Sequence, residues 1–335
     1  MATKTMIKIH TLLMTERGNS DATASETLTL LRRLNGNKPF TSVKFLTDVD
    51  TVVAALGPAE STKKKQLGKI VAALAVLKAD KSNLYKAAAR KYRDLFDDKT
   101  EEVAKAVAER AGEKTETEKA KWMDWPEVEA RFKLLADNVA VVADKKHLSR
   151  EEWRVVQAHA LLALYVLMPP RRNKDYQQMY VVRKSDQATD TTRNYYVLTE
   201  EKMYFNTYKT AKALGPQVVD VPAALGEILR AFLKRTTLYV ETKGNSPGGY
   251  PLVCGQAGLH LKAPNAMTYL LGDALNKPGA GSNMLRHSYI THKYGGVSAE
   301  MAEDAEAMAH SVGTQATYIR VPTVGGAGVD TVELV

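Results

Sequence analysis

Apolar residues in the first hundred positions recur every three or four residues, which is the spacing of one face of an α-helix. The pattern is interrupted at Gly36 to Pro39 and again at Gly57-Pro58, where glycine and proline end helices. Residues 1–22 show no sustained period and are predicted to form an arm. Residues 23–97 are predicted to form a helical domain with helices over Ser25–Leu34 and Ser42–Leu56, from Ser61 or Thr62 through Leu77, and over Asn83–Phe96.

The pattern weakens over residues 98–121, which are mostly Ala, Glu and Lys and predict a charged linker or mobile helix. Apolar residues return at Trp122 to Trp125. The segment Leu148–Leu167 predicts a buried helix that Ser149 caps. A second domain is therefore predicted over residues 122–325, followed by a tail over residues 326–335.

After Pro170 the apolar spacing changes to that of β-strands, with short segments rich in Tyr, Val and Met. These predict a small antiparallel sheet ending in a hairpin, so the expected fold class is mainly α with one such sheet. The predicted strands are Tyr176–Val182, Asn194–Leu198, Lys202–Thr207 and Gln217–Val221. The predicted later helices are Pro222–Lys234, Ala263–Leu275, Ser282–Tyr294, which stops at Gly295-Gly296, and Ser298–Ala309.

The composition is that of a folded protein, with 335 residues of which 44% are apolar and 25% charged. The single cysteine, Cys254, excludes a disulfide framework and a cysteine-based metal site, and it favours a reducing compartment. The richest apolar run, Ala158 to Met168, is too short to cross a membrane, and no signal peptide is recognised. We therefore expect an intracellular protein without a membrane partner.

The formal net charge of +9 is concentrated in one segment. Residues 61–93 hold ten Lys and Arg side chains against Asp80 alone, while the remaining residues sum to zero. Such a segment indicates a polyanion partner, with nucleic acid ahead of a membrane surface, and a solvated helix face is the alternative. The candidate DNA contacts are Lys63, Lys64, Lys65, Lys69, Lys86, Arg90, Lys91 and Arg93.

Four motifs in the second domain share an order and spacing with one enzyme family. They are PPRRNKDY from residue 169, YKTAKALGPQVVDVP from 208, NMLRHSYITHKYG from 283 and MAHSVGTQATYIR from 308. In this order the region 148–320 resembles the catalytic domain of the tyrosine recombinases, the phage-integrase family. The resemblance implies an α+β catalytic domain preceded by a helical core-binding domain.

The resemblance also implies five catalytic residues. Tyr318 would be the nucleophile, and Arg172 and Arg286 would clamp the phosphate, because a planar guanidinium binds two oxygens at once. Lys209 would protonate the leaving 5′ oxygen. His310 would donate a hydrogen bond to the phosphate or help to remove the proton of the Tyr318 phenol.

Supporting roles follow from the same motifs. Asp175 is expected to orient Arg172, and His287 follows the second arginine. Asn283 stands where the family often has a histidine, and an amide can donate a hydrogen bond there without transferring a proton. Arg171 and Lys212 lie close enough in the sequence to compete for the first arginine and lysine roles.

The expected function is DNA breaking and rejoining through a 3′-phosphotyrosyl intermediate, for DNA integration or site-specific recombination. No cofactor, metal or ATP is expected, since the phosphotyrosyl bond conserves the energy of the phosphodiester. The expected partners are double-stranded DNA and further copies in a homotetramer on DNA, with the tail exchanged between protomers. Two alternatives remain open: a type IB topoisomerase and a non-catalytic DNA-binding protein of the same fold.

Overall fold

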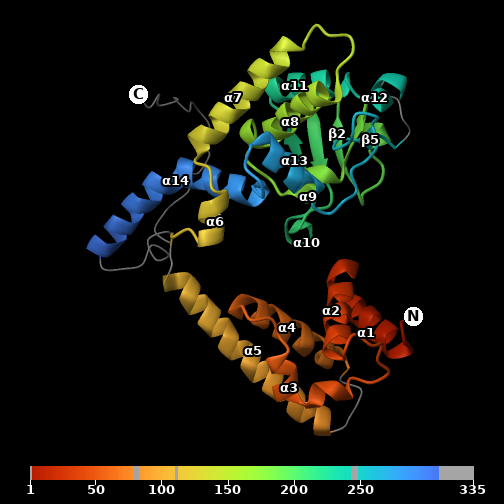
Figure 1. The fold of residues 1–335 in the computed structure, drawn as a ribbon, viewed down its shortest axis with the longest axis vertical. Helices are drawn as coiled ribbons and strands as arrows, with labels where there is room; N and C mark the ends of the chain where they lie inside the picture. The colour runs from red at the N-terminus through yellow and green to blue at the C-terminus, as the bar shows by residue number, and fades with distance from the viewer. Residues whose placement is uncertain (1, 78–82, 110–111, 243–247, 309–335) are drawn as a thin grey trace, which may run out of the picture. The chain divides into compact units, whose positions relative to one another are not determined.

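The chain folds into two compact units, Met1–Glu113 and Lys114–Val335, called here the N-terminal and C-terminal units. The computed structural model describes residues 2–77, 83–109, 112–242 and 248–308 (Figure 1). The described residues are mainly helical, with 62% helix and one small mixed sheet of five strands. None of the described helices combines the length and the apolar content needed to cross a bilayer.

All the regular elements that the structure describes in the N-terminal unit are helices. Its elements are α1 (Lys4–Thr15), α2 (Asp21–Leu34), the 3-10 helix η1 (Lys44–Thr47), α3 (Val49–Ala54), α4 (Glu60–Val76) and α5 (Asn83–Glu109). Ile9, Leu31, Leu46 and Ile70 are fully buried in its core. The hydroxyl of buried Tyr92 on α5 donates to the Leu46 carbonyl at 3.0 Å, which joins α5 to η1.

The predicted N-terminal arm is wrong, because most of residues 1–22 belong to helix α1 and the start of α2. Thr3 caps α1, since its hydroxyl accepts a hydrogen bond from the Met6 amide at 3.3 Å. Met6, Ile9 and Leu13 are buried in the core of the unit. These three side chains follow the helical spacing, but the single short stretch did not stand out in the sequence.

Three helix boundaries in this unit differ from prediction. The expected helix Ser42–Leu56 is split into η1 and α3, because the Asp48 carboxylate accepts from the Thr51 amide at 3.2 Å and starts a new helix. Helix α4 begins at Glu60, without a side-chain cap from the predicted serine or threonine. Helix α5 continues to Glu109, so the first half of the predicted linker is helical.

The C-terminal unit packs helices around a sheet. Its helices are α6 (Glu116–Lys121), α7 (Trp125–Val141), α8 (Arg150–Val166), α9 (Asn173–Gln177), η2 (Ser185–Gln187), α10 (Ala211–Leu214), α11 (Ala223–Leu233), α12 (Thr237–Thr242), α13 (Ala266–Ala274) and α14 (Ser282–Ala307). Helix α8 lies centrally and contacts α7, α11 and α13 (Figure 1). The predicted Ser149 cap of α8 is confirmed, because its hydroxyl accepts from the Glu152 amide and Glu152 accepts from the Ser149 amide.

The sheet has the strand order β4-β3-β2-β1-β5, with β1 (Met179–Val182), β2 (Asn194–Val197), β3 (Lys202–Phe205), β4 (Gln217–Asp220) and β5 (Tyr250–Pro251). The expected antiparallel sheet is wrong for one pair, since β1 and β2 run parallel. The connection over residues 183–193, which contains η2, returns the chain to the start of the sheet, so that β2 runs in the same direction as β1. The other pairs are antiparallel, and the short strand β5 had not been predicted.

Helix α14 is one continuous element from Ser282 to Ala307. The sequence predicted two helices with a break at Gly295-Gly296. The residues after the pair are mostly Ala, Glu and Met, which favour helix strongly enough to carry it past two glycines. The first turns of α14 hold the motif that contains Arg286.

Candidate active site and basic surface

Arg172 and Arg286 lie on elements that a hydrogen-bonded asparagine holds together. Arg172 is the N-cap residue of α9, and Arg286 lies in the second turn of α14. The amide of Asn173 donates to the Ser282 hydroxyl at 3.2 Å, and its side chain donates to the Thr268 hydroxyl at 2.9 Å. The chain next to the first arginine is therefore fixed to the start of the helix that carries the second.

The two arginines are half-buried, and neither guanidinium makes a hydrogen bond or ion pair with any other described residue. A half-buried arginine in a protein interior is usually matched by a carboxylate, because desolvating an unmatched charge is costly. A guanidinium without an internal ion pair can bind an external anion, and a phosphate fits the geometry of its donors.

Asp175 forms its ion pair with Arg171, and its expected role of orienting Arg172 stays a prediction. The Arg171 Nε atom lies 3.1 Å from the Asp175 Oδ2 atom. The same guanidinium donates to the Gln217 side chain at 3.0 Å, and its carbon lies 3.8 Å from the Phe205 ring centroid. The ring and the amide, both from the β3–β4 hairpin, fix Arg171 beside the carboxylate and leave Arg172 unpaired.

The Asp175 carboxyl is buried, and this burial raises its pKa above the ordinary value of 3.8. The positive charges of Arg171 and Arg172 oppose the effect without cancelling it. Its Oδ1 atom has no hydrogen-bond partner among the described residues. Arg171 and Asp175 therefore form a structural pair that anchors α9 to the hairpin.

Lys209 lies exposed on the connection between β3 and β4. The neighbouring Tyr208 hydroxyl donates to the Gly215 carbonyl at 2.6 Å, which closes this connection into a compact turn. The Arg171 guanidinium also faces the Tyr208 ring, with 5.3 Å between the guanidinium carbon and the ring centroid. Within the described residues no contact joins Lys209 to Arg172 or Arg286.

Asn283 and His287 line a cavity of about 300 Å³ at the start of α14. The opposite wall comes from α6 and the residue after it, with Glu118, Lys121 and Trp122. Hydrogen bonds from the residue that caps α6 lower the pKa of Glu118, and the nearby charge of His287 adds to this effect. The sequence carried no signal that α6 would reach this cavity, because its charged residues looked like part of a linker.

His310 and Tyr318 lie outside the described residues, as does the tail at 326–335. The structure therefore describes the arginine side of the candidate site and its neighbours on α14. No group of three or more His, Cys, Asp or Glu side chains in the described ranges is arranged to hold a metal ion.

The lysines at the start of α4 pair with carboxylates of the same unit. Lys63 Nζ lies 3.1 Å from Glu60, and Lys65 and Lys69 lie 3.6 Å and 2.7 Å from the Glu26 carboxylate. Glu60 and Glu26 fall outside the segment in which the sequence charge was counted. This part of the basic segment is therefore partly neutralised by the fold.

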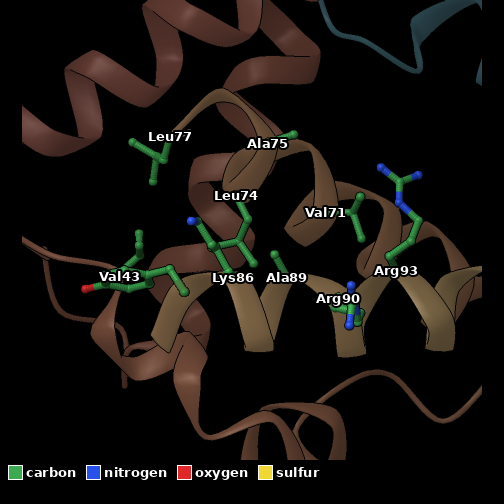
Figure 2. A pocket seen from close by; sticks show the side chains of 10 residues that line it. Val43, Val71, Leu74, Ala75, Leu77, Lys86, Ala89, Arg90 and Arg93 are labelled. Carbon is green, nitrogen blue, oxygen red and sulfur yellow. The ribbon is translucent and has the colours of Figure 1, made fainter. Parts of the chain in front are cut away.

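The basic residues of α5 differ, because Lys86, Arg90 and Arg93 are exposed and have no ion pair among the described residues. Their spacing of four and three places them on one face of the helix. They line a cavity of about 350 Å³ whose other wall is apolar and includes Val71 and Leu74 of α4 (Figure 2). Lys91 lies exposed on an adjacent face of α5, and Lys64 on α4 is half-buried without an ion pair.

No model of a known protein family matches the chain, and no curated protein sequence matches it.

Proposed function

We propose that this protein is a tyrosine-type site-specific recombinase that breaks and rejoins duplex DNA. The observation that carries the proposal is the pair of half-buried arginines, Arg172 and Arg286, whose guanidinium groups form no hydrogen bond or ion pair within the described residues. The contrast with Arg171 supports it, because that arginine has the buried ion pair expected of a structural residue. Arginines without an internal partner fit a role in binding an external phosphate.

The proposed cleavage step needs only side chains of the protein. The Tyr318 phenol oxygen attacks the scissile phosphorus, a new P–O bond forms, and the bond from phosphorus to the 5′ oxygen breaks with its electron pair on that oxygen. His310 takes the phenol proton, and Lys209 gives a proton to the leaving oxygen. Arg172 and Arg286 stabilise the negative charge that develops on the non-bridging oxygens.

Rejoining reverses these steps with a 5′ hydroxyl from the same or another strand. The phosphotyrosyl bond is a phosphodiester like the one it replaces, so neither ATP nor a metal ion is required in this scheme. Asn283 and His287 lie on the same end of α14 as Arg286 and would hydrogen-bond the phosphate or its neighbours.

The N-terminal unit would supply most of the DNA affinity through phosphate contacts. Lys86, Arg90 and Arg93 share one exposed face of α5, and their charges are unmatched by described carboxylates. Phosphate contacts position a protein on DNA without reading sequence, so they suit a domain that holds the duplex for the other unit. Assembly as a homotetramer on DNA, with exchange of strands between two duplexes, belongs to the same proposal.

A trapping experiment tests the proposal. The full chain is incubated with a library of nicked duplexes, in which the short fragment released by cleavage diffuses away and leaves the protein attached to DNA. We expect a covalent adduct on a denaturing gel with the wild type and with Tyr269→Phe, an exposed tyrosine on α13 that serves as a matched control. We expect none with Tyr318→Phe or Arg172→Ala.

Three outcomes would change the assignment. DNA binding without any adduct across the library would favour a non-catalytic DNA-binding protein. An adduct that persists in Tyr318→Phe would overturn the nucleophile. Relaxation of a supercoiled plasmid without strand exchange between duplexes would favour a type IB topoisomerase.

A further inference from the structure

The cavity between α6 and the start of α14 is lined by Glu118, Lys121 and Trp122, and the proposed cleavage step uses none of these three (Figure 1). Its volume of about 300 Å³ is at the lower end of the range for small-ligand sites, so it suits one ring system. Gly279 and Gly281 also line it, and a Cβ atom on Gly279 would lie 3.2 Å from the Lys121 Cε atom. The glycines therefore keep space for a ligand beside the backbone.

The half-buried Glu118 carboxylate has one oxygen atom available to a ligand. Its Oε2 atom accepts from the amide and from the hydroxyl of Thr115, each at 2.9 Å, in the capping box of α6. These bonds lower the pKa of Glu118, with a smaller contribution from the nearby charge of His287, so the carboxylate is ionised at neutral pH. The Oε1 atom has no hydrogen bond or ion pair with any described residue. A ligand that replaces water at Oε1 must supply a hydrogen-bond donor.

The indole ring of Trp122 gives the cavity an aromatic wall. Its Nε1 atom donates to the Asp124 carboxylate at 2.6 Å, and the Lys114 ammonium lies 3.9 Å from the ring centroid. These contacts hold the half-buried ring in place and occupy its polar atom, so the surface that it gives to the cavity is apolar. A planar ligand ring stacks on such a surface, and stacking on aromatic side chains is a main source of affinity for unpaired nucleotide bases.

Cations and amides complete the match to a nucleotide. Lys121 is exposed and forms no ion pair within the described residues, so its ammonium is available to a phosphate. Asn173 and Asn283 line the cavity, and they lie one residue after Arg172 and one turn before Arg286. The exposed Asn283 amide both donates and accepts hydrogen bonds, as the edge of a base does.

We propose that this cavity binds a single unpaired nucleotide whose base carries an exocyclic amino group. The base stacks on Trp122, its amino group donates to the Glu118 Oε1 atom, and its phosphate lies beside Lys121. Adenine, guanine and cytosine have such a group, and thymine and uracil do not. The nucleotide is either part of the bound DNA or free in solution. The DNA source rests on the proposed recombinase function, whereas recognition of the nucleotide rests on the cavity alone.

Binding of free nucleotides to the full chain tests the recognition. Isothermal titration calorimetry compares dCMP with dUMP, whose bases differ where cytosine has the amino group and uracil a carbonyl oxygen. We expect dCMP to bind about tenfold more tightly, because dUMP leaves the ionised Glu118 oxygen without a donor. Trp122→Leu should weaken dCMP binding by about tenfold, the loss expected when a stacked base loses its aromatic partner.

Glu118→Gln changes the selectivity without removing the capping box, because glutamine serves at this position as glutamate does. With the amide oxygen on the two Thr115 bonds, the NH₂ group is presented to the cavity as a donor. We expect this variant to prefer dUMP over dCMP. Glu116→Gln is the matched control, since Glu116 lies on the same helix, pairs with Lys119 at 2.7 Å and does not line the cavity. It should bind both nucleotides as the wild type does.

A second arm of the test uses duplexes with one unpaired base. Fluorescence anisotropy compares a duplex carrying a single bulged cytosine with one carrying a bulged uracil in the same sequence. We expect the wild type to bind the cytosine bulge about fivefold or more tightly, and Glu118→Gln to reverse the order.

The two arms distinguish the sources of the nucleotide. Selectivity with free nucleotides alone would assign the site to a soluble nucleotide, and selectivity with duplexes alone would assign it to DNA. No selectivity in either arm, or selectivity that Glu118→Gln leaves unchanged, would overturn the inference. Neither arm requires a covalent adduct, so a failure of the recombinase function would leave the nucleotide site standing, and the reverse also holds.

Discussion

The salt dependence of DNA binding distinguishes the two parts of the basic segment. In the proposed complex Lys86, Arg90 and Arg93 contact phosphates, because their exposed charges have no ion pair among the described residues. The perturbation is the triple replacement of these residues by glutamine. All three side chains lie on the surface of α5, where such replacements change the free energy of unfolding by roughly 0.5 kcal/mol or less each.

The magnitude follows from counterion release. Each phosphate contact contributes about 0.9 to the slope of log affinity against log salt concentration, so loss of three contacts should reduce the slope by about 2.7. Between 50 and 200 mM salt the wild type should then lose about 40-fold more affinity than the triple variant. Fluorescence anisotropy of a labelled duplex over this salt range measures both slopes.

A matched triple variant in α4 provides the control. Lys63, Lys65 and Lys69 already lie beside Glu60 or Glu26, so their replacement by glutamine should reduce the slope by less than about 1. An unchanged slope in the α5 variant would show that the basic face of α5 remains in solvent and does not contact DNA phosphates. A larger effect from the α4 variant than from the α5 variant would refute the reasoning that internal pairing removes a lysine from the DNA contact.

Three further predictions concern the C-terminal unit. Arg171→Ala should lower the free energy of unfolding by about 2–4 kcal/mol, because it leaves a buried carboxylate unpaired, whereas Arg172→Ala should stay within about 1 kcal/mol of wild type in urea titrations. Burial lowers the pKa of His159 below its usual 6.5, so the unfolded chain binds more protons and stability is lost as the pH falls through 6.5. Urea titrations at pH 7.5 and 5.5 should show that His159→Leu loses less stability than wild type, and an equal loss would contradict this. Gly249→Ala should destabilise by about 1–3 kcal/mol in thermal unfolding, because φ is 81° and a Cβ would lie 2.7 Å from the Val181 carbonyl oxygen, and an unchanged midpoint would contradict it.

Local patterns in the sequence predicted much of the secondary structure. The apolar run of α8 with its Ser149 cap is confirmed, as is the helix that follows Pro222. Strands β2, β3 and β4 lie within the predicted segments. These features depend on residues a few positions apart, so periodicity and capping preferences suffice to recognise them.

Features that depend on distant residues were not predictable in this way. The parallel pairing of β1 with β2 depends on the path of the connection between them. The choice of Arg171 as the Asp175 partner depends on Phe205 and Gln217, which lie 34 and 46 residues further along the chain from Arg171. The pairing of α4 lysines with Glu26 likewise joins two helices, so a charge count over one segment overstated the free charge.

The identity of the residue bonded to DNA tests the central claim most directly. The adduct trapped on a nicked duplex is digested with protease and nuclease, and the remaining nucleotide-bearing peptide is sequenced by mass spectrometry. We predict a nucleotide joined through its 3′ phosphate to the Tyr318 phenol oxygen. A nucleotide on any other residue, or one joined through a 5′ phosphate, would contradict the proposed mechanism.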